Sequence, residues 1–282
     1  MVACERYAVI GFPLEHTLSP AIHNSVFSKL DVPAIYEKAV VKKSELEGFC
    51  RDETLQGFNV TIPHKEAIVK FLSRLEEDAK ISGAVNTVLR TPTGLLGYNT
   101  DMQGLLLAIR RLGFDYKDSR IAVIGSGGAA VGVVIKAAME GAKSITIIAR
   151  NEGKAEAIRA KAIAAKNVDI QICRLAGLAY AEEKFDILVN ATPLGMGRAG
   201  DDFQDFSFLK SMTNGALVYD MVYNNWETGL IREAKAQGLV TGNGLSMLVS
   251  QALLADGIFL GDRFPEERAG EIFEQVYNEV VK

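Results

Sequence analysis

The chain has 282 residues, of which 48% are hydrophobic and 23% are charged, and its formal net charge is −4 at pH 7. This length predicts two domains of moderate size, and the composition excludes a disordered, collagen-like or disulfide-scaffold chain. The negative charge argues against nucleic acid as a partner, because proteins that bind it usually carry a broad basic face.

The first part of the chain alternates short apolar segments with helical ones, the pattern of an α/β domain. Strands are expected at 7–10, 34–41, 57–61, 84–90 and 95–98. The last two form a hairpin joined at Thr93 and Gly94. Helices are expected at 20–30, 44–51 and 65–71.

From residue 119 the alternation becomes more regular. Strands are expected at 121–124, 144–149, 168–173, 186–190, 216–221 and near Val240, and helices at 129–139, 154–165 and 228–237. This pattern is typical of a doubly wound Rossmann sheet with right-handed crossovers. The predicted fold class is therefore α/β with two domains, joined within a helix at about 104–112.

A glycine-rich segment directly follows the strand at 121–124 and opens the next helix. Its residues are Gly125, Ser126, Gly127, Gly128 and Ala129. In this setting glycines allow a tight turn and a close approach of the backbone to a pyrophosphate, and the helix N-terminus supplies free N–H groups. We expect a dinucleotide site here, with a turn that holds no ligand as the alternative.

The next strand ends without the Asp or Glu that an NAD-binding protein usually offers to the ribose. Arg150 and Lys154 stand there instead. A guanidinium can hold a 2′-phosphate through two hydrogen bonds, so we expect NADP as the cofactor. The alternative is a solvated basic start of the helix.

The polar clusters of the first half lie where strands end, which is the usual place for ligand groups in an open α/β sheet. They cover 11–20, 59–65, 83–87 and 97–104. Hydroxyl, amide, ammonium and carboxylate groups are all present, and such a set suits a small polyhydroxylated substrate.

At these clusters the sequence resembles the shikimate dehydrogenase family, which includes shikimate/quinate dehydrogenases. The matching segments, in order, are HTLSPAIHN (16–24), NVTIPHK (59–65), GAVNT (83–87), GYNTDMQG (97–104), GSGGA (125–129), NATPLGM (190–196) and GLSMLVSQ (244–251). The resemblance implies an oxidoreductase that reversibly reduces 3-dehydroshikimate to shikimate with NADPH, in the chorismate route to aromatic amino acids.

By this resemblance Lys65 and Asp101 are the catalytic pair. Ketone reduction needs a proton at the developing alkoxide, and an ammonium group can both stabilise and protonate that oxygen. The alternatives are a surface lysine for Lys65 and a helix N-cap for Asp101, which could serve in both roles.

The resemblance also assigns binding residues. The substrate carboxylate is expected to contact Thr17, Ser19 and Tyr223, and the ring hydroxyls Thr61, Asn86 and Gln251. The cofactor is expected to contact Asn190, Thr192 and Gly244, although a simple strand-to-loop turn would also explain the first two.

Because Gln251 is expected to face the first half, the C-terminal helices should return to it. The predicted domains are therefore a substrate-binding catalytic domain, 1–104 with 243–282, and an NADP-binding domain, 105–242.

The histidines His16, His23 and His64 show no metal-ligand spacing, so we expect structural roles for them and no metal. Three unpaired cysteines, Cys4, Cys50 and Cys173, indicate reduced thiols and a cytoplasmic protein. Charged and amide side chains interrupt the most apolar stretches, so no membrane partner is expected. The expected assembly is a monomer or homodimer.

Two other functions stay open. Thr17 stands where the family has the first serine of a pair, and its extra methyl group leaves a quinate/shikimate dehydrogenase of broader substrate and cofactor specificity as an alternative. The other is a non-catalytic module that senses shikimate.

Overall fold

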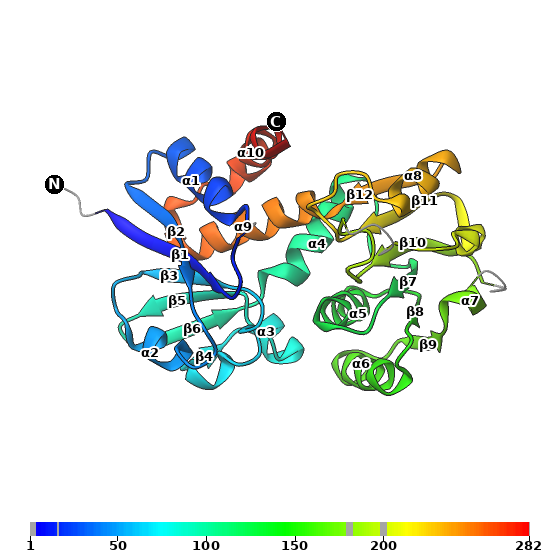
Figure 1. Cartoon of the computed structure of the whole chain (residues 1–282), viewed down its shortest axis with the longest axis horizontal. Coiled ribbons are helices and arrows are strands. Elements are labelled where there is room, and N and C mark those ends of the chain that lie inside the picture. Colours follow the sequence, from blue (N-terminus) through cyan, green and yellow to red (C-terminus); the bar gives the residue numbers. More distant parts are fainter. Residues whose placement is uncertain (1–3, 16, 179–182, 198–201, 282) are drawn as a thin grey trace. The chain divides into compact units, whose positions relative to one another are not determined.

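The computed structural model describes residues 4–15, 17–178, 183–197 and 202–281. The chain divides into two units (Figure 1): the first contains Met1–Gly104 and Val249–Lys282, and the second Leu105–Leu248. Each unit is built on its own six-stranded sheet. Each sheet also carries helices, so the predicted α/β class is confirmed.

The sheet of the first unit is mixed, with the strand order β2-β1-β3-β5-β6-β4. Its strands are β1 (Glu5–Gly11), β2 (Ala34–Val40), β3 (Gly57–Val60), β4 (Arg74–Leu75), β5 (Thr87–Thr91) and β6 (Gly94–Tyr98). β1 runs parallel to β2 and β3, whereas β5 is antiparallel to both β3 and β6. The carboxyl ends of β1, β3 and β6 therefore share one edge with the amino end of β5, and this edge brings the polar clusters together.

Helices surround this sheet, and two of them, α4 and α9, continue into the second unit. The helices are α1 (Ser19–Lys29), α2 (Leu46–Arg51), α3 (Glu77–Ser82), α4 (Thr100–Arg111), α9 (Gly244–Leu260) and α10 (Ala269–Val281). Short 3-10 helices are η1 (Val69–Phe71), η3 (Gly261–Arg263) and η4 (Glu266–Arg268).

The helix predicted at 65–71 is wrong, because only η1 forms there. In an α-helix the carbonyl of Lys65 would accept the N–H of Val69. Instead it accepts the N–H of Val85 at 2.8 Å, and the N–H of Val69 bonds to Glu66. Lys65 thus sits on a series of turns that is tied to the strand edge, which fixes its backbone beside the start of β5.

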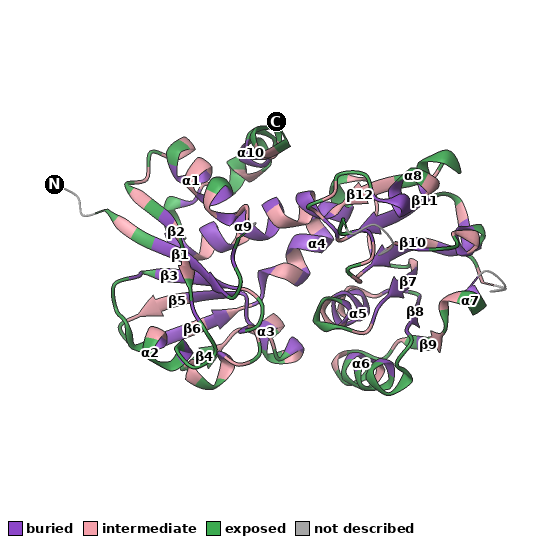
Figure 2. Cartoon of the chain, viewed as in Figure 1, coloured by how far each residue is buried: buried purple, intermediate pink, exposed green. Residues whose placement is uncertain are grey.

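α9 is a long apolar helix in the core. The segment Gly244–Arg263 has the length and composition to cross a membrane, yet 61% of its most apolar window is buried inside the fold. Much of α9 is coloured as buried in Figure 2. Its buried residues include the polar Gln251 and Asp256. Burial of this kind is typical of a core helix.

The sheet of the second unit has the order β12-β11-β10-β7-β8-β9, and all its strand pairs are parallel. Its strands are β7 (Arg120–Ile124), β8 (Ser144–Ile148), β9 (Asp169–Cys173), β10 (Phe185–Asn190), β11 (Met212–Asp220) and β12 (Val240–Asn243). The accompanying helices are α5 (Gly128–Glu140), α6 (Glu152–Ala165), α7 (Leu175–Leu178), α8 (Gly229–Ala236) and the 3-10 helix η2 (Ser207–Ser211).

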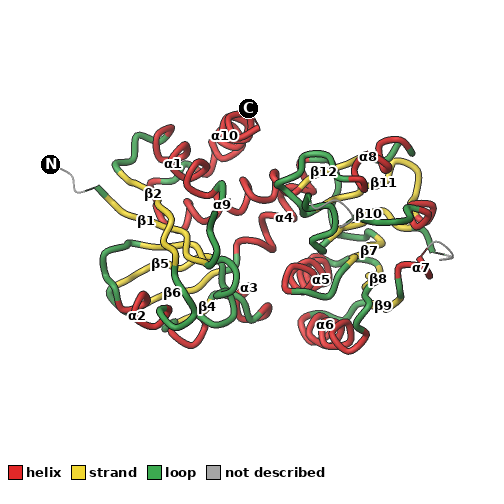
Figure 3. Tube along the Cα trace, in the orientation of Figure 1, coloured by secondary structure: helices red, strands yellow, loops and turns green. Residues whose placement is uncertain are grey.

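This strand order is that of the predicted doubly wound fold, in which helices cover both faces of the sheet (Figure 3). The order reverses between β7 and β10, whose last residues Ile124 and Asn190 are register partners. Ligands of such sheets bind at this switch point. The glycine-rich segment after Ile124 and the loop after Asn190 therefore lie side by side.

A bidentate ion pair joins β7 to β10 in the same sheet. Arg120 donates to both carboxylate oxygens of Asp186 at 2.9 Å, and these hydrogen bonds lower the pKa of Asp186. A carboxyl group whose pKa is lowered on folding stabilises the folded state above its unfolded pKa, near 3.9, and loses this effect as the pH falls.

Asp186→Asn is accordingly expected to lower the melting temperature by about 2–4 °C at pH 7, as a loss of ~1 kcal/mol would in a protein of this size. Thermal unfolding at pH 7, 5 and 3 checks this result. The difference from the wild type should shrink toward pH 3, and a difference that stays constant with pH would contradict the assignment.

Candidate functional site

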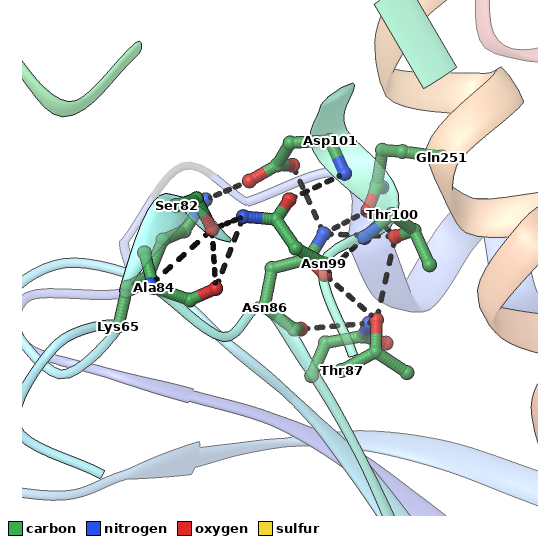
Figure 4. Close-up of polar contacts among 10 residues, drawn as sticks. Lys65, Ser82, Ala84, Asn86, Thr87, Asn99, Thr100, Asp101 and Gln251 are labelled. Atoms are coloured by element: carbon green, nitrogen blue, oxygen red, sulfur yellow. Dashed lines mark hydrogen bonds and ion pairs between the residues drawn. The ribbon is translucent and has the colours of Figure 1, made fainter. Parts of the chain in front are cut away.

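Lys65 and Asp101 form an ion pair at the shared strand edge of the first unit (Figure 4). Lys65 Nζ donates to Asp101 Oδ2 at 2.5 Å. The side chains are 33% and 26% exposed, so the pair is accessible to a ligand. The two residues that the sequence placed in a catalytic role are therefore in direct contact.

Asp101 is held by the start of α4. Asn99 Oδ1 accepts the backbone N–H of Asp101 at 3.1 Å, so Asn99 is the N-cap of this helix. The suggested N-cap role of Asp101 is wrong, because Asp101 lies in the first turn and its carboxylate bonds to Lys65. The amide of Asn99 donates to Ser82 Oγ and to the carbonyl of Ala84, which ties the helix start to the end of α3.

Asn86 lies at the centre of the polar network. Its Nδ2 is 3.0 Å from Asp101 Oδ1 and 3.2 Å from Gln251 Oε1, while its Oδ1 accepts the N–H of Thr100 at 2.8 Å. The side chains of Asn86 and Gln251 are buried. The network thus joins three predicted site residues, Asn86, Asp101 and Gln251, and Figure 4 shows them close together. Asn86 directly precedes β5, Asp101 lies on α4 and Gln251 on α9.

Several members of this network were not predicted as site residues. They are Asn59, Thr87, Asn99 and Thr100, which lie within or beside the quoted motifs. Asn59 donates to Thr87 Oγ1 at 2.9 Å, and Thr87 Oγ1 donates to Asn86 Oδ1 at 3.0 Å. Their position in the motifs was the available signal, but their contacts depend on the order of the strands.

Gly104 lets α4 approach α9 closely at this site. A Cβ added to Gly104 would lie 2.7–2.9 Å from Cβ, N and Cα of Gln251. These atoms belong mostly to the backbone of α9, so the contact cannot be relieved by a side-chain rotation.

We expect Gly104→Ala to destabilise the protein by ~1–3 kcal/mol, the usual cost of overpacking. It should also displace Gln251 from Asn86 and so raise the KM for a substrate held by these two amides. The control is Gly48→Ala, because Gly48 lies on α2 and no atom lies within 4 Å of a Cβ added to it. Gly113→Ala is less suitable, because Gly113 has a positive φ. Thermal unfolding and steady-state kinetics of Gly104→Ala beside Gly48→Ala measure both effects, and equal values for the two variants would exclude this role of Gly104.

The predicted carboxylate-binding hydroxyls also meet. Thr17 Oγ1 donates to Ser19 Oγ at 3.2 Å, at the start of α1. Thr61 follows β3 and is half-buried. Tyr223 belongs to the second unit, after β11, and its part in carboxylate binding stays a prediction.

Two of the three histidines, His23 and His64, are buried and hydrogen-bonded. His64 is buried and its Nε2 lies 2.7 Å from the carbonyl oxygen of Val41, so it holds the turn that precedes Lys65. His23 is also buried and contacts Asp256. His16 lies outside the described residues. A structural role for His23 and His64 agrees with these contacts.

In the second unit, the glycine-rich segment forms the start of α5. Gly125 has a φ of +126°, which favours glycine, and Gly127 is the N-cap without a side-chain hydrogen bond. A Cβ at Gly127 or Gly128 would meet no atom within 4 Å, and Ser126 and Ala129 are at least partly exposed. The first N–H groups of α5 are thus open to an anion such as a phosphate.

Arg150 and Lys154 flank the start of α6. Both are exposed, and neither side-chain cation has a hydrogen-bond or ion-pair partner in the described parts of the chain. Asn151 caps the helix by accepting the N–H of Lys154 at 2.9 Å, which offsets the unfavourable cations at a helix N-terminus. These charges are therefore available to a phosphate on the ribose.

Asn190 and Thr192 follow β10 at the switch point. Asn190 is fully buried, donates to Asp220 Oδ1 at 2.9 Å, and accepts from the N–H and the hydroxyl of Thr192. Asn190 therefore shapes the loop from inside, whereas the half-buried Thr192 can face a ligand.

Gly244 allows a close approach of chain segments. A Cβ there would lie 2.1 Å from the carbonyl oxygen of Met221, so packing alone requires glycine at this position.

Both halves of the chain match family models. Residues 9–88 match the shikimate dehydrogenase substrate binding domain, and residues 107–194 match the shikimate / quinate 5-dehydrogenase domain. Together they cover more than half of the chain.

Curated relatives match nearly the whole chain. Shikimate dehydrogenase (NADP(+)) of Geobacter metallireducens is 39% identical over 266 residues, covering 90% of both chains. The protein of the same name from Gloeothece citriformis is 36% identical, covering 92% of both chains.

The fold is also similar to solved structures of shikimate 5-dehydrogenases. Shikimate 5-dehydrogenase of Listeria monocytogenes, in complex with shikimate and NAD, has a TM-score of 0.85 at 30% identity and covers 95% of this chain and 96% of its own. Shikimate 5-dehydrogenase of Thermus thermophilus, in complex with NADP(H) and shikimate, has a TM-score of 0.82 at 29% identity, with 96% and 99% covered.

Proposed function

The chain belongs to the shikimate dehydrogenase family, and from this premise we propose that it catalyses the reversible NADPH-dependent reduction of 3-dehydroshikimate to shikimate. The observation that carries the proposal is the ion pair of Lys65 and Asp101, at 2.5 Å, within a buried network of amide and hydroxyl groups. A dehydrogenase needs such a proton-transferring group beside the reacting carbonyl.

Lys65 is the group that we assign to proton transfer. Its ammonium donates a proton to the alkoxide oxygen as the carbonyl is reduced, which leaves a neutral amine, and in the reverse direction this amine accepts the proton of the hydroxyl. Asp101 orients the ammonium through their hydrogen bond. Because Asn86 donates to the other oxygen of Asp101, the carboxylate is fixed at both ends.

The substrate is assigned to the hydrogen-bonding groups around this pair. Asn86, Thr61 and Gln251 suit the ring hydroxyls, because amide and hydroxyl groups both donate and accept hydrogen bonds. Thr17 and Ser19 suit the carboxylate, with Tyr223 as a further contact. A buried polyhydroxylated ring needs a partner for each of these groups.

NADP fits the open start of α5 and the cations at α6. The residues that we assign to holding it are Gly125, Ser126, Gly127, Gly128, Ala129, Arg150, Lys154, Asn190, Thr192 and Gly244. When bound, NADPH supplies the hydride. The N–H groups of α5 suit its pyrophosphate, and Arg150 with Lys154 suits its 2′-phosphate. In this assignment Asn190 and Gly244 contribute by shaping the backbone around the cofactor.

We also assign the protein to the cytoplasm, as a monomer or homodimer without nucleic-acid or membrane partners. The free thiols of Cys4, Cys50 and Cys173 support a reducing compartment. The net charge of −4 supports the absence of a nucleic-acid partner.

A steady-state assay that combines shikimate or quinate with NADP+ or NAD+ tests the function. We expect the highest kcat/KM with shikimate and NADP+. A higher kcat/KM with quinate, which Thr17 leaves open, would assign the broader specificity. Binding of shikimate with no reduction of either nicotinamide would show a sensing module instead.

A further inference from the structure

We propose that the buried pair of His23 and Asp256 is a positioning device that fixes α9, and with it Gln251, relative to α1, which carries Ser19. The inference rests on the proposed function, since it concerns two side chains assigned there to the substrate. Neither His23 nor Asp256 is placed in contact with the substrate itself.

The pair is completely buried. His23 Nδ1 lies 2.6 Å from Asp256 Oδ1, and both side chains are 0% exposed. Among the described residues, the second polar atoms, His23 Nε2 and Asp256 Oδ2, have no hydrogen-bond partner. Burying polar atoms in this way costs free energy that one bond recovers only in part, so apolar residues would stabilise this position at least as well.

We therefore assign the pair a role that depends on the directionality of its hydrogen bond. A hydrogen bond requires a defined distance and angle between the two helices, whereas apolar contacts tolerate small shifts. The neighbours Ala252 and Ala255 on α9 are fully buried and small, and they offer little interlocking to hold the helix in register. Phe259 of α9 stacks on Tyr7, with centroids 4.8 Å apart, and so holds α9 against β1, whereas the bond to His23 fixes α9 relative to α1.

Each residue of the pair lies near a residue on its own helix that is proposed to bind the substrate. His23 follows Ser19 by one helical turn on α1, so the two side chains occupy the same face. Asp256 follows Gln251 on α9, about 7.5 Å further along the axis. The pair thus links the helix of the carboxylate-binding hydroxyls to the helix of the amide that bonds to Asn86.

A second contact leads from His23 to the same network. Its ring stacks on Tyr36, with centroids 4.0 Å apart and planes at 11°. The hydroxyl of Tyr36 donates to Asn59 Oδ1 at 2.6 Å, and Asn59 donates to the carbonyl of Asn86 at 3.1 Å. Asn86 is thus bonded to Gln251 and to Asn59, and His23 contacts the element behind each of them: α9, which carries Gln251, and the ring of Tyr36, whose hydroxyl bonds to Asn59.

Two substitutions at one position test the proposal. Asp256→Asn keeps an oxygen that accepts from His23, whereas Asp256→Leu has the same number of side-chain heavy atoms and no acceptor. We expect Asp256→Leu to raise the KM for shikimate about three- to tenfold, the range for one positioned hydrogen bond, and to leave the KM for NADP+ unchanged. Asp256→Asn should stay within about twofold of the wild type in both, since it retains that bond.

Lys29→Met is the matched control. Lys29 lies on α1 like His23 and ties this helix to Glu279 of α10 at 2.5 Å, but this ion pair is not buried: the two side chains are 19% and 51% exposed. Its loss should change neither KM. A general loosening of the protein would raise the KM for both substrates in Asp256→Leu, and this result would overturn the proposal, as would an unchanged KM for shikimate.

If Asp256→Leu does not fold, His23→Phe/Asp256→Leu is measured in the same way, because it keeps the ring on Tyr36 and leaves no unpaired polar group. Failure of both variants to fold would overturn the proposal, since the pair would then serve stability. Measurements on the wild type distinguish failure of the proposed function from failure of the positioning role. An inactive wild type contradicts the proposed function. An active wild type whose KM for shikimate is unchanged by Asp256→Leu contradicts only the positioning role.

Discussion

Lys65→Ala is expected to lower kcat by about two to four orders of magnitude, with a smaller change in the KM for shikimate. The side chain of Lys65 gives a proton to the reacting oxygen as an ammonium and takes it back as a neutral amine, so its loss should raise the energy of the transition state more than that of the bound substrate. In the structure its hydrogen-bond partner is the carboxylate of Asp101, which keeps it in place. Steady-state kinetics in the direction of shikimate oxidation measure the effect.

Two further variants sharpen this prediction. Lys65→Arg keeps the positive charge but carries a guanidinium that does not release its proton, so its kcat should stay low. Lys70→Ala removes an exposed lysine from the same segment and should leave kcat unchanged. A kcat near the wild-type value for Lys65→Ala or Lys65→Arg would remove Lys65 from the proton-transfer step.

The sequence predicted the main parts of this site because its motifs lie at strand ends. Lys65, Asn86 and Asp101 belong to three such motifs, and the antiparallel pairing of β5 with both β3 and β6 brings them to one edge. Asn59 and Thr87 were missed although they lie in the same motifs. Their contact depends on the register in which Asn59 faces Thr87 across β3 and β5, and spacing along the chain does not specify this register.

Local ambiguity explains the other errors. Asn99, Thr100 and Asp101 are all residue types that cap helices, so the sequence alone could not locate the N-cap to one residue. The helix predicted at 65–71 fails because the carbonyl of Lys65 bonds to Val85, a contact made by tertiary structure. The first error thus arises from neighbouring residues of equal capping ability, and the second from a hydrogen bond formed outside the local segment.

The return of the C-terminal helices was predicted from a single motif, the one that ends in Gln251. In the structure the returning part begins at Val249, after the first turn of α9. The hydroxyls of Tyr219 and Ser246 bond at 2.8 Å, and Gly244 donates its N–H to Val222, so this turn belongs to the second unit.

The second large effect is expected at the cofactor. Arg150→Ala should raise the KM for NADPH about 10- to 100-fold, because hydrogen bonds to a charged group contribute about 1.5–3 kcal/mol each. The KM for NADH should change little, since NADH carries no 2′-phosphate. The exposure of Arg150 and its lack of a partner among the described side chains favour this role.

A matched control separates the local charge from the general basicity of the helix. Arg159 lies on α6 as well, but pairs with Glu156 at 2.8 Å, so Arg159→Ala should leave both KM values unchanged. Lys154→Ala should give a smaller rise for NADPH than Arg150→Ala, because an ammonium binds phosphate as a point charge without the bidentate geometry of a guanidinium. If Arg150→Ala keeps the wild-type KM for NADPH, the 2′-phosphate is bound elsewhere. If it instead raises the KM for NADPH and NADH equally, Arg150 contacts a part that the two cofactors share, such as the adenine ring, and the preference for NADP must have another origin.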